Sequence, residues 1–157
     1  MFALSRRAAL ALPLLAAGAA WAVTEDADNT VIMTLKNGKV VIRLRPDWAP
    51  KHVEQIKALV KRGFYDGLSF HRVVPDFVAQ GGDPFGDGEG GPGWALPDEH
   101  TALHFDRGTL GIATSGPETG GSQFFFCHSA QPHLDGRYTV AGQLEGGDTT
   151  EIESGQH

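Results

Sequence analysis

The stretch FYDGLSFHRVVPDFVAQGGDP, from Phe64 to Pro84, holds two short apolar runs, 68–74 and 77–79, on either side of one proline. A single cation, Arg72, lies among these hydrophobic neighbours. A guanidinium keeps its charge at every physiological pH, and its burial is costly unless it is paired or directed at a ligand. Arg72 is therefore either half of a structural ion pair or a working group of the protein.

A second stretch, GIATSGPETGGSQFFFCHS from Gly111 to Ser129, is a glycine-rich turn region followed by an apolar strand. Together the two stretches resemble the cyclophilin family of peptidyl-prolyl cis-trans isomerases. FHRVVPDFVAQGGDP is similar to that family's catalytic strand pair, and SGPETGGSQFFF to its substrate-binding segment. The motifs FYDGLSF, GGPG at 90–93 and LDGRYTVAG at 134–142 stand in the matching order, so the resemblance covers roughly residues 31–148.

The composition and the hydrophobic pattern predict one mainly β domain. The chain has 157 residues, of which 41% are hydrophobic and 20% charged, which suits a single core. Asn37-Gly38 separates two β-rich runs, 31–35 and 39–44, and favours a hairpin between them. Further strands are expected at 69–74, 77–80, 109–114, 124–128 and 138–144. One amphipathic helix is expected over 50–62, with its apolar face over the open end of the sheet.

Short strands separated by glycine- and proline-rich turns are typical of a small antiparallel barrel. The resemblance implies a closed antiparallel eight-stranded β-barrel capped by helices. The end of the chain, GGDTTEIESGQH at 146–157, contains Ile152 as its only large apolar residue. We therefore expect the carboxyl-terminal closing strand to be missing, which would leave the strand at 31–35 with an unpaired edge.

The first 22 residues have the pattern of a secretory signal peptide. Arg6 and Arg7 precede an apolar run at 8–19, and small residues precede the cleavage site expected after Ala22. The run is shorter than the ~20 residues of a membrane-spanning helix, so we expect no membrane association after cleavage. The domains predicted are a signal peptide at 1–22, a flexible segment at 23–29 and the cyclophilin-like domain at 30–157. The protein is expected in the periplasm, exported by either the Sec or the twin-arginine route.

The net charge argues against a nucleic-acid partner, and the cysteine content excludes an internal disulfide. The net charge of −6 disfavours nucleic acid as a partner. Cys127 is the only cysteine, so no internal disulfide can form, and its apolar surroundings predict a buried, inert thiol. We expect a monomer.

Neither a metal nor a cofactor is predicted. Gly86, Gly88 and Gly91 formally satisfy GxGxxG, but no helix can open at Pro92 and the loop is acidic, which argues against a phosphate site. The acidic residues at 83, 87 and 89 do not have the spacing of an EF-hand loop. The histidines at 100 and 104 are expected on the surface.

Rotation about an X-Pro bond, the reaction that the resemblance implies, needs no nucleophile, carboxylate pair or metal. Its barrier of about 18–20 kcal/mol is the loss of amide resonance, and no covalent bond is broken. The lone pair of the prolyl nitrogen is delocalised in the planar amide and localised in the twisted one. A fixed donor beside that nitrogen therefore binds the transition state better than either isomer. The rigid, permanently charged fork of Arg72 suits this role.

The resemblance assigns the remaining roles residue by residue. Arg72 is the catalytic residue, and His71 and Tyr138 support the site. The substrate-binding residues are Phe77, Val78, Gln80, Ala113, Thr114, Gln123, Phe125, His133 and Leu134. Phe77, Val78, Phe125 and Leu134 would form an apolar slot for the proline ring, and the two glutamines would hold Arg72 and the substrate backbone.

This sequence departs from the family's pattern at four of those positions. Val78 replaces a methionine, which widens the slot, Thr114 replaces an asparagine, and Tyr138 replaces a histidine. His133 stands where many members carry tryptophan, so the resemblance implies at most weak cyclosporin binding.

The function predicted is peptidyl-prolyl cis-trans isomerisation that assists protein folding, with unfolded or flexible X-Pro segments as substrates. One alternative is a catalytically weak module that binds proline-containing chains as a holdase or scaffold. A metal- or calcium-binding β-domain is a third, which rests only on the acidic glycine-rich loop.

Overall fold

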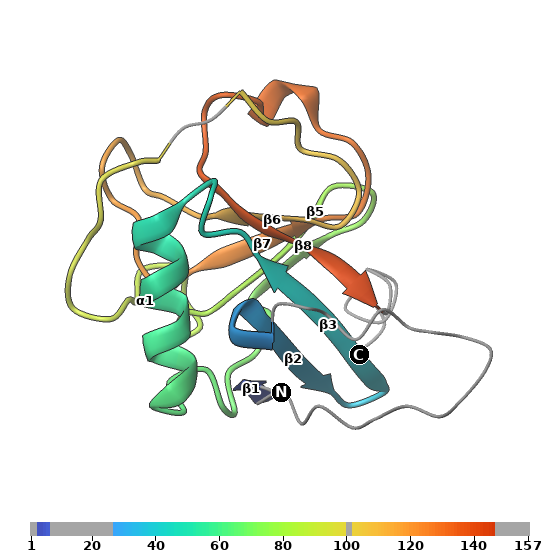
Figure 1. The fold of residues 1–157 in the computed structure, drawn as a ribbon, viewed down its shortest axis with the longest axis vertical. Helices are drawn as coiled ribbons and strands as arrows, with labels where there is room; N and C mark the ends of the chain where they lie inside the picture. The colour runs from blue at the N-terminus through green and yellow to red at the C-terminus, as the bar shows by residue number, and fades with distance from the viewer. Residues whose placement is uncertain (1–2, 7–26, 100–101, 147–157) are drawn as a thin grey trace.

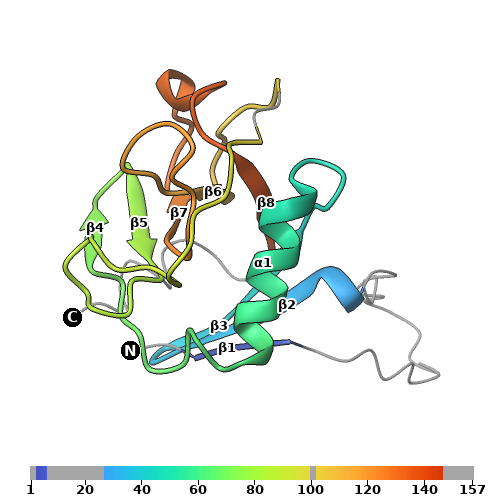
Figure 2. The ribbon, with the colours of Figure 1, turned by 90° about the vertical axis from the view of Figure 1, so that its left-hand side faces the viewer.

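The computed structural model describes residues 3–6, 27–99 and 102–146. Eight strands form one sheet in which every paired strand is antiparallel to its neighbour, in the order β1-β2-β3-β8-β6-β7-β5-β4. Within the described residues β1 and β4 are the two ends of this order, and the sheet curls between them (Figures 1 and 2). The strands are β1 (Ala3–Arg6), β2 (Thr30–Leu35), β3 (Gly38–Leu44), β4 (Arg72–Val74), β5 (Val78–Gly81), β6 (Thr109–Ile112), β7 (Phe124–Cys127) and β8 (Val140–Gly146).

The described helices are α1 (Pro50–Lys61) and two single-turn 3₁₀ helices, η1 (Ala27–Asn29) and η2 (Pro132–Leu134). The predicted helix is confirmed to within one residue at its end, while the several capping helices implied by the resemblance reduce here to one α-helix. Helix α1 lies over the concave side of the sheet (Figure 2). Its residues Val53, Ile56 and Val60 enter the main core, as their helical spacing predicts.

All seven strands predicted from the sequence are present. β2 and β3 form the expected hairpin, in which Leu35 pairs with Gly38 around a two-residue turn. β4 is shorter than predicted, because the strand begins at Arg72 rather than Ser69.

The alternation of side chains along β7 divides the apolar residues into two groups. Phe124 and Phe126 enter the main core, where Phe124 meets Tyr65 and Phe70 edge-to-face at centroid distances of 5.7 and 6.2 Å. Phe125 and Cys127 point to the other side of the sheet and belong to a second, smaller cluster. This second cluster forms the candidate site.

The edge of β2 is occupied, so the expectation of an unpaired edge at 31–35 is wrong for the full chain. β1 pairs with it, from Ala3 opposite Thr34 to Arg6 opposite Val31. Residues 3–6 belong to the predicted signal peptide, in which no strand was expected. The closing strand predicted to be missing after Gly146 falls on 147–157, outside the described residues.

The other domain predictions have mixed outcomes. The last three residues of the segment predicted as flexible, 27–29, form η1, and Asp28 there contacts Lys57 at 2.6 Å. Residues 23–26 and the cleavage site after Ala22 lie outside the described residues. None of the helices in the described ranges has the length and apolar character needed to cross a membrane.

Candidate active site

The turn between β4 and β5 positions the first wall of the site. Phe77 N–H donates to the carbonyl of Val74 at 3.1 Å across Pro75-Asp76, and Asp76 adopts a φ of 60°. Proline at the second position and a positive φ at the third are the features of a type II turn. The Asp76 carbonyl accepts hydrogen bonds from Ser129 and Gln131, which fixes the turn to the segment after β7.

Arg72 is the first residue of β4, directly opposite Gln80 of β5. Its guanidinium carbon lies 5.7 Å from the centroid of the Phe77 ring. The side chain is exposed on β4, which is an edge strand of the described sheet. Among the described residues no carboxylate forms an ion pair with it. Of the two alternatives left by the sequence, the structural ion pair is therefore unsupported within this part of the chain.

An apolar cluster lies beside Arg72, where the slot for the proline ring is predicted, and we keep the name slot for it. Four predicted residues form it together: Val78, Phe125 and Leu134 are buried, and Phe77 is partly buried against them. Ala113 and Tyr138 pack on the same cluster, and the Tyr138 ring meets Phe125 edge-on at 5.7 Å.

Two more aromatic contacts and one glycine define the shape of the slot. Phe105, which the sequence analysis missed, stacks on Phe125 with centroids 5.6 Å apart and an interplanar angle of 22°. Gly111 lies opposite Phe125, and a Cβ there would be 2.3 Å from the Phe125 ring. The exposed His133 ring, whose centroid lies 5.6 Å from that of the Phe77 ring, stands at the rim of the slot.

A polar pocket of about 340 Å³ adjoins the slot. Four predicted substrate-binding residues line it: Gln80, Ala113, Thr114 and Gln123. Of these, Ala113 also packs on the slot. The remaining wall is residues 88–94, a glycine-rich loop in which no site residue was predicted, with parts of 115–122, which lie in the segment predicted to bind substrate.

The two glutamines bind each other and the pocket loop. Gln80 Nε2 donates to Gln123 Oε1 at 2.9 Å, and Gln123 Nε2 donates to the carbonyls of Gly88 and Gly90, both at 2.9 Å. The expected contact between a glutamine and the Arg72 guanidinium is not formed among the described residues. Gln123 therefore fixes the wall of the pocket, and Gln80 connects that wall to the strand opposite Arg72.

Asp83 organises the base of the same loop. Its side chain is buried and accepts hydrogen bonds from the backbone N–H groups of Phe85 and Gly88 at 2.8 and 2.5 Å. Burial favours the neutral acid, but backbone hydrogen bonds from Phe85, Gly88, Gly90 and Gly86 together outweigh it and lower the pKa of Asp83. The Asp83 carboxylate therefore stabilises the loop by accepting hydrogen bonds from its backbone.

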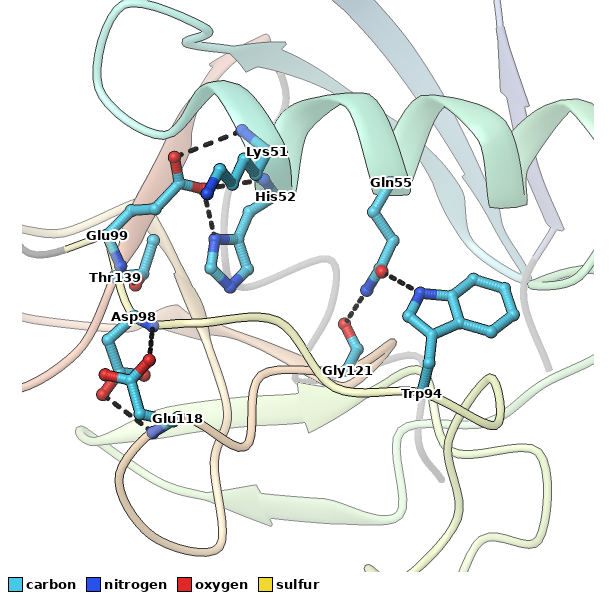
Figure 3. A network of polar contacts seen from close by, with 9 residues as sticks. All are labelled: Lys51, His52, Gln55, Trp94, Asp98, Glu99, Glu118, Gly121 and Thr139. Atoms are coloured by element: carbon cyan, nitrogen blue, oxygen red, sulfur yellow. Dashed lines mark hydrogen bonds and ion pairs between the residues drawn. The ribbon is translucent and has the colours of Figure 1, made fainter.

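The far wall of the pocket is connected to helix α1 by two polar contacts (Figure 3). Trp94 Nε1 donates to Gln55 Oε1, and Gln55 Nε2 donates to the carbonyl of Gly121 at 2.8 Å. Glu99 accepts hydrogen bonds from the backbone N–H groups of Lys51 and His52, and its Oε1 lies 2.5 Å from His52 Nδ1. Both loops that line the pocket are therefore held by the first turns of α1.

The remaining residues named from the sequence line neither the slot nor the pocket. His71 is half-buried just before β4, and its Nδ1 has no hydrogen-bond partner among the described residues. Cys127 is buried, as predicted, and burial raises its pKa to about 12, which disfavours the reactive thiolate. His104 is on the surface as predicted and contacts Asp135 at 2.7 Å, while His100 lies outside the described residues.

The site residues that the sequence analysis missed are Phe105, Trp94, Asp83 and Glu99. Phe105 and Glu99 lie in irregular segments with no periodic pattern, so their contacts had no sequence signal. Trp94 did have one, because a large aromatic residue in a glycine-rich loop is unusual unless it packs or binds.

Comparison with known proteins agrees with this geometry. The family described as "Cyclophilin type peptidyl-prolyl cis-trans isomerase/CLD" matches residues 30–155. A probable peptidyl-prolyl cis-trans isomerase of Brucella suis is 46% identical over 160 residues, covering 93% of this chain and 82% of that protein. Peptidyl-prolyl cis-trans isomerase B of Bacillus subtilis is 47% identical over 125 residues, covering 76% of this chain and 85% of that protein.

Solved structures give the same result. A cyclophilin-type isomerase of Cryptosporidium parvum, crystallised in the presence of the dipeptide Ala-Pro, superposes with a TM-score of 0.75 at 33% identity, covering 82% of this chain and 85% of that one. The slot, the two strands that carry it and these matches lead to one conclusion: the chain belongs to the cyclophilin-type peptidyl-prolyl cis-trans isomerase family.

Proposed function

We propose that this peptidyl-prolyl cis-trans isomerase catalyses rotation of X-Pro bonds through Arg72, with the proline ring held in the slot of Phe77, Phe125 and Leu134. The observation that carries the proposal is the position of the Arg72 guanidinium, 5.7 Å from the Phe77 ring at the edge of that slot. An exposed guanidinium that is not held by a carboxylate of the described chain is available to a ligand.

The mechanism is differential hydrogen bonding. The planar X-Pro amide offers almost no lone pair on nitrogen, whereas the twisted amide offers a localised one that a guanidinium N–H can bind. The rigid slot holds the ring while the carbonyl side of the bond turns. No proton has to be transferred, so His71 needs only to support the strand.

The substrates proposed are unfolded or flexible polypeptides that contain proline, whose folding the enzyme assists. The Ala-Pro dipeptide named with the Cryptosporidium relative supports this class. His133 takes the place of a tryptophan donor at the rim, so cyclosporin is expected to bind weakly.

The proposed location is the periplasm, after export directed by residues 1–22 and cleavage after Ala22. We expect the full chain to be a monomer, since β1 occupies one end of the sheet and the short β4 the other.

A protease-coupled assay on a proline-containing peptide tests the catalytic role of Arg72. Arg72→Ala should lower kcat/KM by about 10²–10³, with the larger part of the loss in kcat, because the lost interaction is made in the transition state. Arg72→Lys should also be poor, since an ammonium lacks the planar fork. Lys39→Ala, which removes an exposed cation from β3, is the matched control and should leave kcat/KM unchanged.

The outcome that would overturn the proposal is an Arg72→Ala protein that is folded by circular dichroism and keeps its activity. Peptide binding without catalysis in the unmodified chain would instead support the holdase.

A further inference from the structure

The two end strands of the sheet are protected from other chains in different ways. β4 has three residues, begins with the charged Arg72 and is followed by Pro75. Shortness, charge and proline are the devices that prevent an edge strand from pairing with another molecule. β2 has six residues, TVIMTL, and contains neither a charge nor a proline. Its own sequence therefore gives β2 none of this protection.

In the structure β2 is covered by β1 instead. Ala3, Leu4, Ser5 and Arg6 pair in sequence with Thr34, Met33, Ile32 and Val31 in an antiparallel register. β1 is the outermost strand of the sheet at this end, near the carboxyl-terminal end of helix α1 (Figures 1 and 2). The edge of β2 is therefore able to accept an antiparallel strand over at least four residues.

The covering strand lies within the segment that the proposed export would remove. Cleavage after Ala22 takes away residues 1–22 and with them β1. The backbone N–H and C=O groups along one side of Val31–Thr34 then lose their partners, while the apolar residues Val31 and Met33 stay in the core. Such an edge is a template for another strand.

We infer that, once residues 1–22 are removed, β2 pairs antiparallel with β2 of a second copy of this chain, about a two-fold axis that passes between the two Ile32 residues. When β2 of one copy pairs with β2 of the other, the backbone groups of both open edges form hydrogen bonds at once. The result is a two-fold dimer, the simplest closed symmetry. Side chains directly opposite in an antiparallel pair lie on the same face, so the register must join residues of the same parity.

The register centred on Ile32 meets this condition. It places Val31 opposite Met33 of the second copy, both on the core side. It also places Thr30 opposite Thr34 of the second copy, so that all the paired residues lie within β2 and no two like charges face each other. The monomer proposed above is thus a property of the chain that still carries β1.

The first test compares the chain before and after cutting. A specific protease site is placed within residues 7–26 of the full chain, and the folded protein is cut and freed of the amino-terminal peptide. Multi-angle light scattering should give a monomer before cutting and, after cutting, a mass that rises to twice the monomer's with concentration. In case cutting unfolds the protein, the uncut chain with Leu4→Pro and Ser5→Pro should also dimerise, because prolines disrupt β1.

The second test reports the register. Ile32→Cys faces itself across the proposed axis, and the natural Cys127 is buried, so mild oxidation should cross-link the cut protein and leave the uncut protein monomeric. Ala58→Cys, exposed on helix α1, is the matched control and should not cross-link. Thr34→Lys should restore the monomer by placing a charge on the edge, whereas Ala58→Lys, with the same change in net charge, should not.

A cut protein that stays monomeric at every concentration would overturn the inference. Amide exchange would then show why: slow exchange at 31–34 would mean that residues 147–157 cover the edge, and fast exchange that it stays open. The inference depends on the proposed export only for its occurrence in the cell. The Arg72 assay runs on the same samples, and its failure would leave the association result intact, because the slot is built on β4, β5 and β7.

Discussion

Gly111 illustrates how tightly single residues define the proline slot. It lies opposite Phe125, and the ring fills the space that a side chain would take. A Cβ at this position would be 2.3 Å from a ring carbon, so the buried ring has to move. The absence of a side chain at Gly111 is therefore what lets Phe125 lie flat against Phe105 in the slot.

Gly111→Ala should lower kcat/KM for a proline peptide several-fold and should lower the free energy of unfolding by about 1–3 kcal/mol, the usual effect of overpacking a core. Coupled-assay kinetics and urea titration measure the two effects. Gly146→Ala in β8 is the control, because its Cβ would meet Val41 at 3.4 Å, an ordinary contact. Unchanged kinetics for Gly111→Ala would show that Phe125 is not a wall of the substrate site.

His133 is the residue at which the rim of the slot differs from the family's pattern. His133→Trp restores an indole donor beside Phe77 and should tighten cyclosporin binding by roughly 2–10-fold, corresponding to one hydrogen bond of about 0.5–1.5 kcal/mol. Isothermal titration calorimetry provides the measurement, with Lys39→Trp as an added tryptophan far from the slot. Equal affinity of the two variants would remove His133 from the ligand-contacting rim.

At the scale of an element, helix α1 receives its amino-terminal cap from a distant part of the chain. Ala49, the residue before the helix, makes no side-chain cap, and the first N–H groups are satisfied by Glu99 instead. Burial favours the neutral acid at Glu99, but hydrogen bonds from His52 and Lys51 outweigh it and lower the pKa of the carboxyl. The negative charge thus lies at the positive end of the helix dipole.

Glu99→Gln should lower the free energy of unfolding by about 1–3 kcal/mol, since it weakens the cap and leaves the buried His52 without its charged partner. It should also raise KM, because Glu99 belongs to the segment that continues from the pocket wall at Trp94. Glu54→Gln, an exposed carboxylate in the same helix, is the matched control for urea denaturation. An equal, small effect of the two changes would contradict the capping role.

For the whole molecule, several carboxylates make stability depend on acid pH. A hydrogen bond from Arg45 lowers the pKa of Asp47, and one from His104 lowers that of Asp135, in addition to the lowered pKa values of Asp83 and Glu99. Each group has a lower pKa folded than unfolded. Its contribution is therefore present above the unfolded value of about 4 and is lost as the pH falls through the lower folded value.

His104 has the opposite effect on the pH dependence of stability. Its hydrogen bond with Asp135 raises its pKa, so its contribution is complete below its unfolded pKa of about 6.5 and is lost as the pH rises through the raised value. The free energy of unfolding should thus change little between about pH 5 and 6 and should fall steeply below about pH 4. Urea titrations at a series of pH values measure this profile.

The double variant with Asp83→Asn and Glu99→Gln should be less stable than the natural chain at pH 7 and should lose less stability on acidification. A natural chain equally stable at pH 3 and pH 6 would contradict the assignment of these carboxylates. The same profile from the double variant would locate the acid sensitivity elsewhere.

Short segments of the sequence were enough to predict the features that depend on neighbouring residues. Asn37-Gly38 specified the β2–β3 hairpin, Pro50 and the spacing of Val53, Ile56 and Val60 specified helix α1, and the β-rich runs located seven strands. The motifs around Arg72 and Gln123 identified the family and the residues of the slot. These predictions succeeded because turn chemistry, helix period and family motifs are properties of neighbouring residues.

Contacts between residues far apart in the chain became known only from the folded structure. The cap of α1 by Glu99, the stacking of Phe105 on Phe125 and the exposure of Arg72 on an edge strand depend on which strands become neighbours. The cover of β2 by Ala3–Arg6 is the clearest case. Strand pairing uses backbone N–H and C=O groups, which nearly every residue has. An unpaired edge can therefore pair with a segment whose side-chain pattern does not predict a strand.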